Sequence, residues 1–217
     1  MLAYRVSQNS VDVYDVHEKR STTINADYII LACPAYLAKY LIENAPAVGS
    51  FEYAPWLVAN LTLEAFPRER SGAPIAWDNV IYESDSLGYV VATHQSLRTF
   101  QPETVFTFYQ PLTGSSAAAE RSRLLSTDWQ TWVDFIMADL SKPHPEIRGL
   151  VRNVDIMRWG HAMVRPKPGF IWGEARQRLA RPFGRIHFAH SDLSGFSLFE
   201  EAQFRGVVAA DRILNVL

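Results

Sequence analysis

The chain has 217 residues, 48% of them hydrophobic, and is long enough for one large domain or two small ones around a real core. Its 21 basic residues nearly balance its 23 acidic residues, which gives no electrostatic reason to expect a nucleic-acid partner or an anionic membrane surface. The lone Cys33 excludes an internal disulfide and a multi-cysteine zinc site. No apolar run approaches the roughly 20 residues needed to span a bilayer, and the N-terminus lacks the apolar core of a signal peptide, so we expect a cytoplasmic protein.

The first 45 residues alternate between strand and turn signals. Polarity alternates over residues 4–7 and 11–16, which predicts a β-hairpin followed by a charged loop at 18–20. The apolar run 28–32 ends before Pro34 and predicts a strand buried on both faces, as in a parallel sheet. Apolar residues at helical spacing then predict a helix over 35–44.

The middle of the chain has a different pattern. Four β-rich runs are separated by Pro and Gly and predict an antiparallel sheet: 56–63, 79–82, 88–92 and 104–109. Residues 117–140 predict a helix or helix pair with Trp129, Trp132 and Leu140 on one face. A further strand is predicted at 154–159, before a Pro- and Gly-rich loop at 165–169.

The last thirty residues carry the most specific pattern. A short buried strand around Ile186 and Phe188 leads to the polar trio His190, Ser191 and Asp192, and a helix is predicted over 199–214. A strand in a parallel sheet delivers its C-terminal end to the ligand crevice, so these polar residues are candidates for ligand contact. Ser197 and Glu200 have the Ser-x-x-Glu spacing of a capping box, and the helix start that follows can stabilise negative charge.

These pieces define an α/β (α+β) fold of two domains. Both chain ends, 1–45 and 180–217, have the pattern of doubly wound α/β structure, and together they predict one partial, Rossmann-like domain. The mixed sheet and helices of 46–179 then form an inserted second domain.

The two ends also resemble the FAD-dependent amine oxidase and phytoene desaturase family. Phe188-Ala189-His190-Ser191-Asp192 is similar to that family's F-A-G-x-E pattern, and residues 200–206 with Ala209-Ala210 are similar to its E-G-A-x-x-S-G segment and small-residue pair. Residues 26–34 resemble its returning strand, A-D-x-V-I-x-A-x-P. The resemblance implies an FAD-binding domain at the chain ends and a substrate-binding domain at 46–179.

The resemblance also implies which residues approach FAD. Asp192 would lie near the ribityl chain or pyrophosphate, and the backbone of Glu200, Glu201 and Ala202 would face the pyrimidine edge of the flavin. Cys33, Pro34, His190 and Ser191 complete this predicted contact set. Cys33 does not lie where the family's covalent members carry their cysteine, so noncovalent binding is expected.

The sequence departs from the family pattern in two ways. His190 and Glu201 stand where the family has glycine, so a side chain occupies space that otherwise lets backbone approach the cofactor. The G-x-G-x-x-G turn that cradles the FAD pyrophosphate is absent from the sequence. We therefore expect a chain whose N-terminal FAD-domain segment is missing, completed by that segment or by a homo-oligomer.

Other candidate sites are weaker. Trp159, His161 and Trp172 lie where the family brings aromatic residues near the flavin, and they either line a substrate pocket or pack the Pro-rich loop onto the core. On a strand, His187 and His190 would face opposite sides, which leaves too few ligands for a metal site. Thr93-His94-Gln95 is a polar loop after a strand, without further assignment.

Two functions stay open at this point. The first is an FAD-dependent oxidoreductase that transfers hydride from a C–N or C–C bond of a small molecule, either an amine or an apolar polyene, to flavin. No catalytic acid or base can be named for it. The second is a non-catalytic substrate-domain fragment or binding module that does not hold FAD alone.

Overall fold

The computed structural model describes residues 1–45, 51–72, 74–98, 101–114 and 116–217. The chain divides into two compact units, Met1–Glu52 with Met163–Leu217, and Tyr53–Ala162. Residues 163–179 lie with the chain ends, because the Arg165 amide donates to the Glu52 carbonyl (2.7 Å) and Leu179 belongs to the core of the first unit. Within the described residues, no helix is long and apolar enough to cross a membrane.

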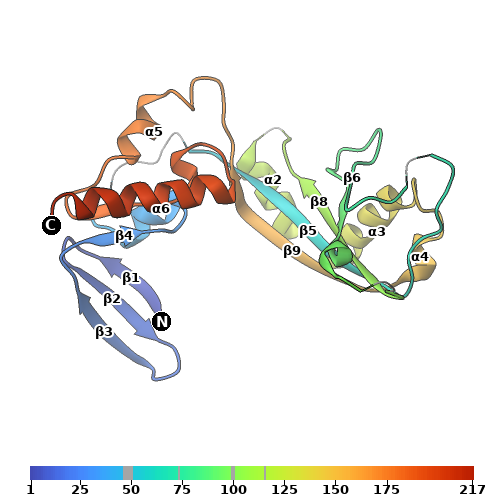
Figure 1. The fold of residues 1–217 in the computed structure, drawn as a ribbon, viewed down its shortest axis with the longest axis horizontal. Coiled ribbons are helices and arrows are strands. Elements are labelled where there is room, and N and C mark those ends of the chain that lie inside the picture. Colours follow the sequence, from blue (N-terminus) through green and yellow to red (C-terminus); the bar gives the residue numbers. More distant parts are fainter. Residues whose placement is uncertain (46–50, 73, 99–100, 115) are drawn as a thin grey trace. The chain divides into compact units, whose positions relative to one another are not determined.

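The first unit holds two small sheets and several helices (Figure 1). Its elements are β1 (Leu2–Val6), β2 (Ser10–Asp15), β3 (Arg20–Asn25), β4 (Ile29–Leu31), η1 (Ala35–Leu37), α1 (Ala38–Leu41), the end of β9 (Val151–Val164), α5 (Glu174–Leu179), β10 (Ile186–Phe188), η3 (Ser191–Leu193) and α6 (Phe199–Leu214).

The N-terminal hairpin continues into a third antiparallel strand. β3 begins at Arg20, inside the segment predicted to be a charged loop, so the loop prediction was wrong at its end. Asp15 Oδ1 accepts the amide hydrogens of His17 and Glu18 (2.9 and 3.1 Å), and this local turn leaves the Thr-rich stretch free to pair with β2.

The second sheet consists of β4 and β10, which pair in parallel although they come from opposite ends of the chain. Ile29, Leu31, Ile186 and Phe188 point into one core with residues of α1 and α5. Ile30 is 43% exposed, so the prediction of a strand buried on both faces was wrong. The predicted helix at 35–44 is shorter than expected, because α1 ends at Leu41.

The second unit is a five-stranded sheet covered by helices. Its elements are β5 (Tyr53–Leu63), β6 (Asp78–Asn79), β7 (Tyr89–Val91), η2 (Ala92–Gln95), β8 (Thr104–Pro111), α2 (Ala117–Ser126), α3 (Trp129–Leu140), α4 (Ile147–Leu150) and most of β9. The strand order is β6-β7-β8-β5-β9.

Alternation of buried and half-buried residues along β5 and β8 turns one sheet face toward α2 and α3. Leu57, Leu61, Phe106 and Phe108 are fully buried there against Ile136. The predicted antiparallel sheet and helix pair are confirmed.

Three details of the second unit differ from expectation. β6 ends at Asn79, so the predicted strand at 79–82 was wrong beyond its first residue; Val80 and Tyr82 are 79% and 88% exposed. The Trp129 side chain does not belong to the buried apolar face of α3, because it is 53% exposed. Its indole N–H donates to the Val154 carbonyl. β9 runs from Val151 to Val164, longer at both ends than the predicted strand.

A buried polar pair lies within the second unit's core. The Tyr89 hydroxyl and His144 Nε2 form a hydrogen bond (2.5 Å), and burial raises the pKa of Tyr89 to about 12. The other ring nitrogen of His144, Nδ1, is buried and has no hydrogen-bond partner among the described residues. Burial lowers the pKa of His144 and holds the ring neutral.

Removing core volume tests whether the second unit depends on this packing. Leu61→Ala should lower the free energy of unfolding by about 2–5 kcal/mol, because Leu61 is 0% exposed and a cavity replaces it. The control Val80→Ala, at a residue that is 79% exposed, should change it by less than about 0.5 kcal/mol. Denaturant unfolding followed by tryptophan fluorescence measures both, and equal effects would contradict the assignment of the core.

The buried histidine predicts a pH dependence of stability. Because its folded pKa is lowered, the unfolded chain binds the proton more readily, so stability is complete above an unfolded pKa of about 6.5 and falls as the pH drops below it. Unfolding curves across this range should show a shallower acid loss for His144→Asn than for the unaltered chain. Some slope should remain, since burial also lowers the pKa of His187. Identical slopes would contradict the assignment.

Candidate functional site

The candidate site lies at the C-terminal edge of the β4–β10 sheet. Ile186 pairs with Ile29 and Phe188 with Leu31, and the Ala189 amide continues the ladder to the Leu31 carbonyl (3.0 Å). Parallel strands in register end at the same edge. Cys33 and Pro34, which follow β4, are therefore neighbours of His190, Ser191 and Asp192, which follow β10.

Asp192 joins the two strand ends. Its Oδ2 accepts the backbone amide hydrogen of Ala35 at 2.9 Å, and the residue is 2% exposed. Ala35 opens η1 directly after Pro34, so this bond supplies an acceptor to an amide at the start of a helical turn. The carboxylate is buried and engaged within the protein, which makes it a positioning group for the edge.

His190 lies beside this carboxylate. Its Nδ1 accepts the Asp192 amide hydrogen at 3.2 Å and also lies 3.2 Å from Asp192 Oδ1. With Nδ1 as the acceptor, Nε2 is the ring nitrogen that can donate a hydrogen. The side chain is 26% exposed and can offer this N–H to a ligand.

Two arginines hold the turn after Asp192, and the sequence analysis missed both. Arg176 of α5 donates to the Leu193 carbonyl (2.6 Å), and Arg205 of α6 donates to Ser194 Oγ (2.8 Å). Burial, and then the nearby Arg176, lower the pKa of Arg205. Arg205 lies four residues before Ala209, on the small-residue side of α6. This position in the sequence was the signal that could have identified Arg205 as a site residue.

Cys33 is unsuited to act as a nucleophile or tether at neutral pH. The residue is half-buried and free. Burial is the main cause that raises the pKa of its thiol, and the charge of Asp192 raises this pKa further. A backbone hydrogen bond lowers it in part. A thiol with a raised pKa stays protonated and weakly nucleophilic.

The start of α6 differs from the predicted capping box. The N-cap is Leu198, and no side chain caps the helix. Ser197 Oγ instead accepts the Val164 amide hydrogen (3.2 Å), which pins the end of β9 to the segment before α6. Glu200 and Glu201 lie in the first turn, where their charge is favourable with the helix dipole but opposes the approach of an anion.

Not all of these residues fit a flavin dinucleotide equally. One edge of the β4–β10 sheet brings together the partly exposed His190 ring and the backbone of Cys33, Pro34 and Ser191. In open α/β sheets a dinucleotide binds at this kind of edge. Glu201 and Ala202 are half-buried on the first turn of α6. Asp192 offers structural support instead of a free oxygen, because Ala35 already occupies Oδ2. These donors fit one side of a dinucleotide site.

The predicted substrate residues fall into both units. Trp159 and His161 lie two residues apart on β9 and so share one sheet face, with the His161 ring edge-on to Tyr53 (centroids 5.8 Å apart). Trp172 belongs to the first unit and is 83% exposed. Among the described residues, no three His, Cys, Asp and Glu side chains gather as a metal-binding group.

Comparison with known proteins assigns the family. The family profile described as flavin containing amine oxidoreductase matches residues 4–214, nearly the whole chain. The chain therefore belongs to the flavin-containing amine oxidoreductase family, and the predicted resemblance is confirmed. No curated protein matches the chain.

Solved structures agree on the fold. Cyclohexylamine oxidase from Brevibacterium oxydans IH-35A is 16% identical, with a TM-score of 0.61 over 95% of this chain and 46% of its own. Wild-type putrescine oxidase bound to putrescine is 13% identical, with a TM-score of 0.65 over 97% of this chain and 47% of its own. The chain thus spans about half the length of these structures, and its mixed α/β fold is that of the FAD-binding amine oxidases.

Gly195, in the turn after Asp192, allows a test of how tightly this turn is packed. Gly195 has φ +81°, and a Cβ there would lie 2.5 Å from Ile171 Cδ1 and 3.2 Å from Phe170 Cε1. Gly195→Ala should lower the free energy of unfolding by about 1–3 kcal/mol, because both the backbone and the packing oppose it.

Gly206 of α6 is the matched control, since a Cβ there meets nothing within 4 Å. Gly206→Ala should raise stability by about 0.4–1 kcal/mol by restricting the unfolded chain. Thermal unfolding by circular dichroism compares the two variants. A neutral Gly195→Ala would show that the turn is not held as described.

Proposed function

We propose that this chain forms the flavin-facing edge and the substrate-binding unit of an FAD-dependent amine oxidoreductase. One observation carries the proposal: β4 and β10, from opposite ends of a chain that matches the family over residues 4–214, meet in parallel with their polar ends joined by Asp192. Open α/β sheets bind ligands at this kind of edge. In this proposal the first unit is a partial, Rossmann-like FAD-binding domain and the second unit is the substrate-binding domain.

FAD would be held without a covalent bond. Cys33, Pro34, His190 and Ser191 would line its binding edge, the first turn of α6 at Glu200, Glu201 and Ala202 would face it, and Asp192 would position them. Bound FAD supplies a hydride acceptor. The protein's own part is to orient the substrate, exclude water and offer the His190 Nε2–H as a hydrogen-bond donor.

The proposed substrate is a small amine oxidised at its C–N bond. The support is the family itself and two structures whose names refer to cyclohexylamine and putrescine. Trp159 and His161 of β9 and Trp172 of the first unit are the proposed substrate contacts. An apolar polyene oxidised at a C–C bond is the competing substrate class. We also propose that the protein works in the cytoplasm.

The proposal includes a partner segment. The chain contains no G-x-G-x-x-G turn and spans about half of its solved relatives, so the FAD domain needs a dinucleotide-binding segment from elsewhere in the polypeptide or from another subunit. The open edge of β4 and the 43% exposed Ile30 are sites where such a segment can add to the sheet.

Flavin binding is tested by titrating the chain with FAD, alone and preceded by the segment of cyclohexylamine oxidase that it lacks. We expect the unfolding temperature to rise with the logarithm of the FAD concentration once this exceeds the dissociation constant, and we expect the extended chain to hold flavin with its visible absorption bands. His190→Trp, which fills the binding edge, should weaken binding at least tenfold, whereas Tyr4→Trp, on the exposed N-terminal strand, should not.

The substrate class is tested under anaerobic conditions with the flavin-loaded extended chain. A primary amine should bleach the flavin bands, because the carbon next to its nitrogen would give up a hydride to the flavin and the nitrogen would lose a proton as the C–N bond becomes C=N, and a polyene should not. Flavin binding without amine bleaching would overturn the amine assignment. A folded extended chain that ignores FAD at about millimolar concentration would overturn the proposed function in favour of a non-catalytic binding module.

A further inference from the structure

Two arginines from different helices meet at the turn after Asp192. Arg176 of α5 donates to the Leu193 carbonyl (2.6 Å), and Arg205 of α6 donates to the hydroxyl of the next residue, Ser194 (2.8 Å). Because the two acceptors belong to consecutive residues, both guanidinium groups are held at one point of the chain. Neither group forms an ion pair with a carboxylate among the described residues.

Part of each guanidinium group remains free to bind a ligand. Arg176 uses its Nε on the Ile171 carbonyl and an Nη1 hydrogen on the turn. Arg205 uses only its Nε. Both arginines are half-buried, yet their remaining nitrogens are not among the buried atoms that lack a partner, so solvent reaches them. Arg205 thus offers two terminal nitrogens in the fork geometry that matches the oxygens of a phosphate or carboxylate group.

The charges that act on Arg205 are mostly positive. Burial lowers the pKa of Arg205, and the charges of Arg176 and Arg212 lower it further. Glu201, one turn earlier on α6, raises it. Arginine stays protonated in proteins, so three positive groups act here against one negative group. Like charges that are partly removed from water repel each other, and a bound anion relieves this repulsion.

We propose that Arg176 and Arg205 form a binding site for a phosphate group. Two guanidinium groups without an ion-pair partner match the nearly double charge of a phosphate better than the single charge of a carboxylate. The phosphate comes either free in solution or as an organic ester, and the 53% exposed Phe204 ring, centred 5.3 Å from Arg205 Cζ, offers a contact for the organic part. Neither arginine belongs to the proposed FAD contacts, so the inference does not depend on the flavin chemistry.

The test is a titration of the full chain with inorganic phosphate at pH 8 and constant ionic strength, followed by calorimetry. We expect saturable binding in about the millimolar range, because half-exposed ion pairs are each weak. Acetate, with a single charge, should bind at least fivefold more weakly. Arg205→Gln should weaken phosphate binding at least tenfold, and Arg205→Lys, which keeps the charge but loses the fork, at least threefold. Glu201→Gln should strengthen it about twofold, because it removes the opposing charge.

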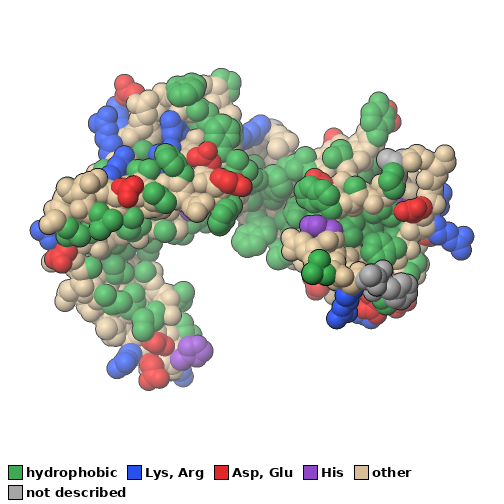
Figure 2. All heavy atoms as spheres, in the orientation of Figure 1, with side chains coloured by type: hydrophobic (Ala, Val, Ile, Leu, Met, Phe, Trp, Pro, Cys, Tyr) green, Lys and Arg blue, Asp and Glu red, His purple; other side chains and the backbone are tan. Residues whose placement is uncertain are grey.

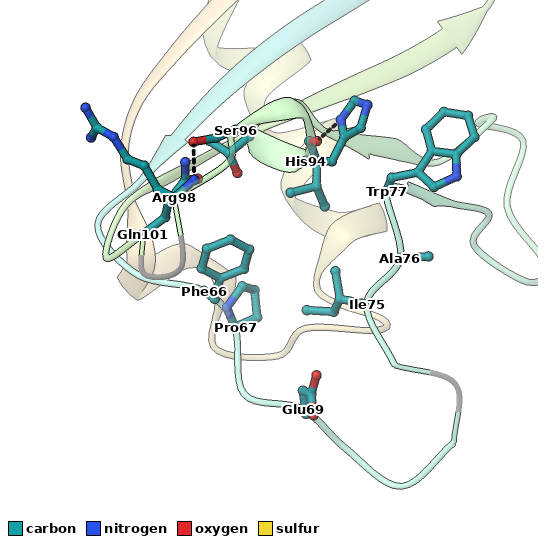
Figure 3. A pocket seen from close by; sticks show the side chains of 12 residues that line it. Phe66, Pro67, Glu69, Ile75, Ala76, Trp77, His94, Ser96, Arg98 and Gln101 are labelled. Atoms are coloured by element: carbon teal, nitrogen blue, oxygen red, sulfur yellow. Dashed lines mark hydrogen bonds between the residues drawn. The ribbon is translucent and has the colours of Figure 1, made fainter.

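Arg98 of the second unit provides the matched control. It borders a surface hollow of about 470 Å³, and its guanidinium extends away from Phe66 and Ile75, which line the same hollow (Figure 3). Among the described residues that line this hollow, Arg98 is the only arginine. Arg98→Gln therefore removes the same charge from a place without a second guanidinium group, and phosphate should bind to this variant as it binds to the unaltered chain.

Phenyl phosphate separates the two sources of the phosphate group. Binding at least fivefold tighter than that of inorganic phosphate, with the advantage lost in Phe204→Ala, identifies an ester, and equal binding identifies free phosphate. The proposal is overturned if neither phosphate binds saturably, if Arg98→Gln loses as much affinity as Arg205→Gln, or if Arg205→Gln binds phosphate unchanged with an unaltered circular dichroism spectrum. Should Arg205→Gln fail to fold, the opposite effects expected of Arg205→Lys and Glu201→Gln decide, and their absence overturns the proposal.

Discussion

The hydrogen bond between the Ala35 amide and the Asp192 carboxylate is the constraint on which the first unit depends. It joins residues 157 positions apart and brings together the ends of β4 and β10. A three-residue strand cannot be stable alone, and a two-stranded sheet gains little without further packing. The buried carboxylate provides an acceptor at the point where both strands stop, and the amide would otherwise lose a partner in the interior. Arg176 and Arg205 then hold the turn that carries this carboxylate.

The second unit has a different basis of stability. Its strands and helices enclose one continuous apolar core, and its buried polar pair is internal to that core. Both units also leave apolar side chains exposed: Phe204 and Val207 on α6 of the first unit are each 53% exposed, and Val80 and Tyr82 of the second unit are 79% and 88% exposed. Figure 2 shows apolar side chains beside acidic ones over α6. The two units differ in their sheets, because β4 and β10 of the first unit form a sheet of only two strands, whereas the second unit has five strands in one sheet.

Much of the site was predictable because its signals are local. Residues 186–188 form a strand and 199–214 a helix, as predicted from apolar runs and spacing. The capping box failed because the Ser197 hydroxyl has two possible donors, and the distant Val164 amide, invisible in the local pattern, is its partner. Arg176 was missed for the same reason, since its target carbonyl lies 17 positions away and carries no sequence signature. Ile30 looked identical to its neighbours in sequence, yet its exposure depends on what covers that face.

The sequence by itself determined the family, most of the strands and helices and the residues that end the two edge strands, since these depend on apolar periodicity, turn residues and local motifs. Only the tertiary structure decided that Asp192 supports the edge from within, that His190 Nδ1 accepts the Asp192 amide hydrogen, and that Arg176 and Arg205 hold the turn that follows. The physical reason is that burial, hydrogen-bond partnership and the approach of separate loops depend on segments far apart in the chain, and a linear pattern records none of these contacts.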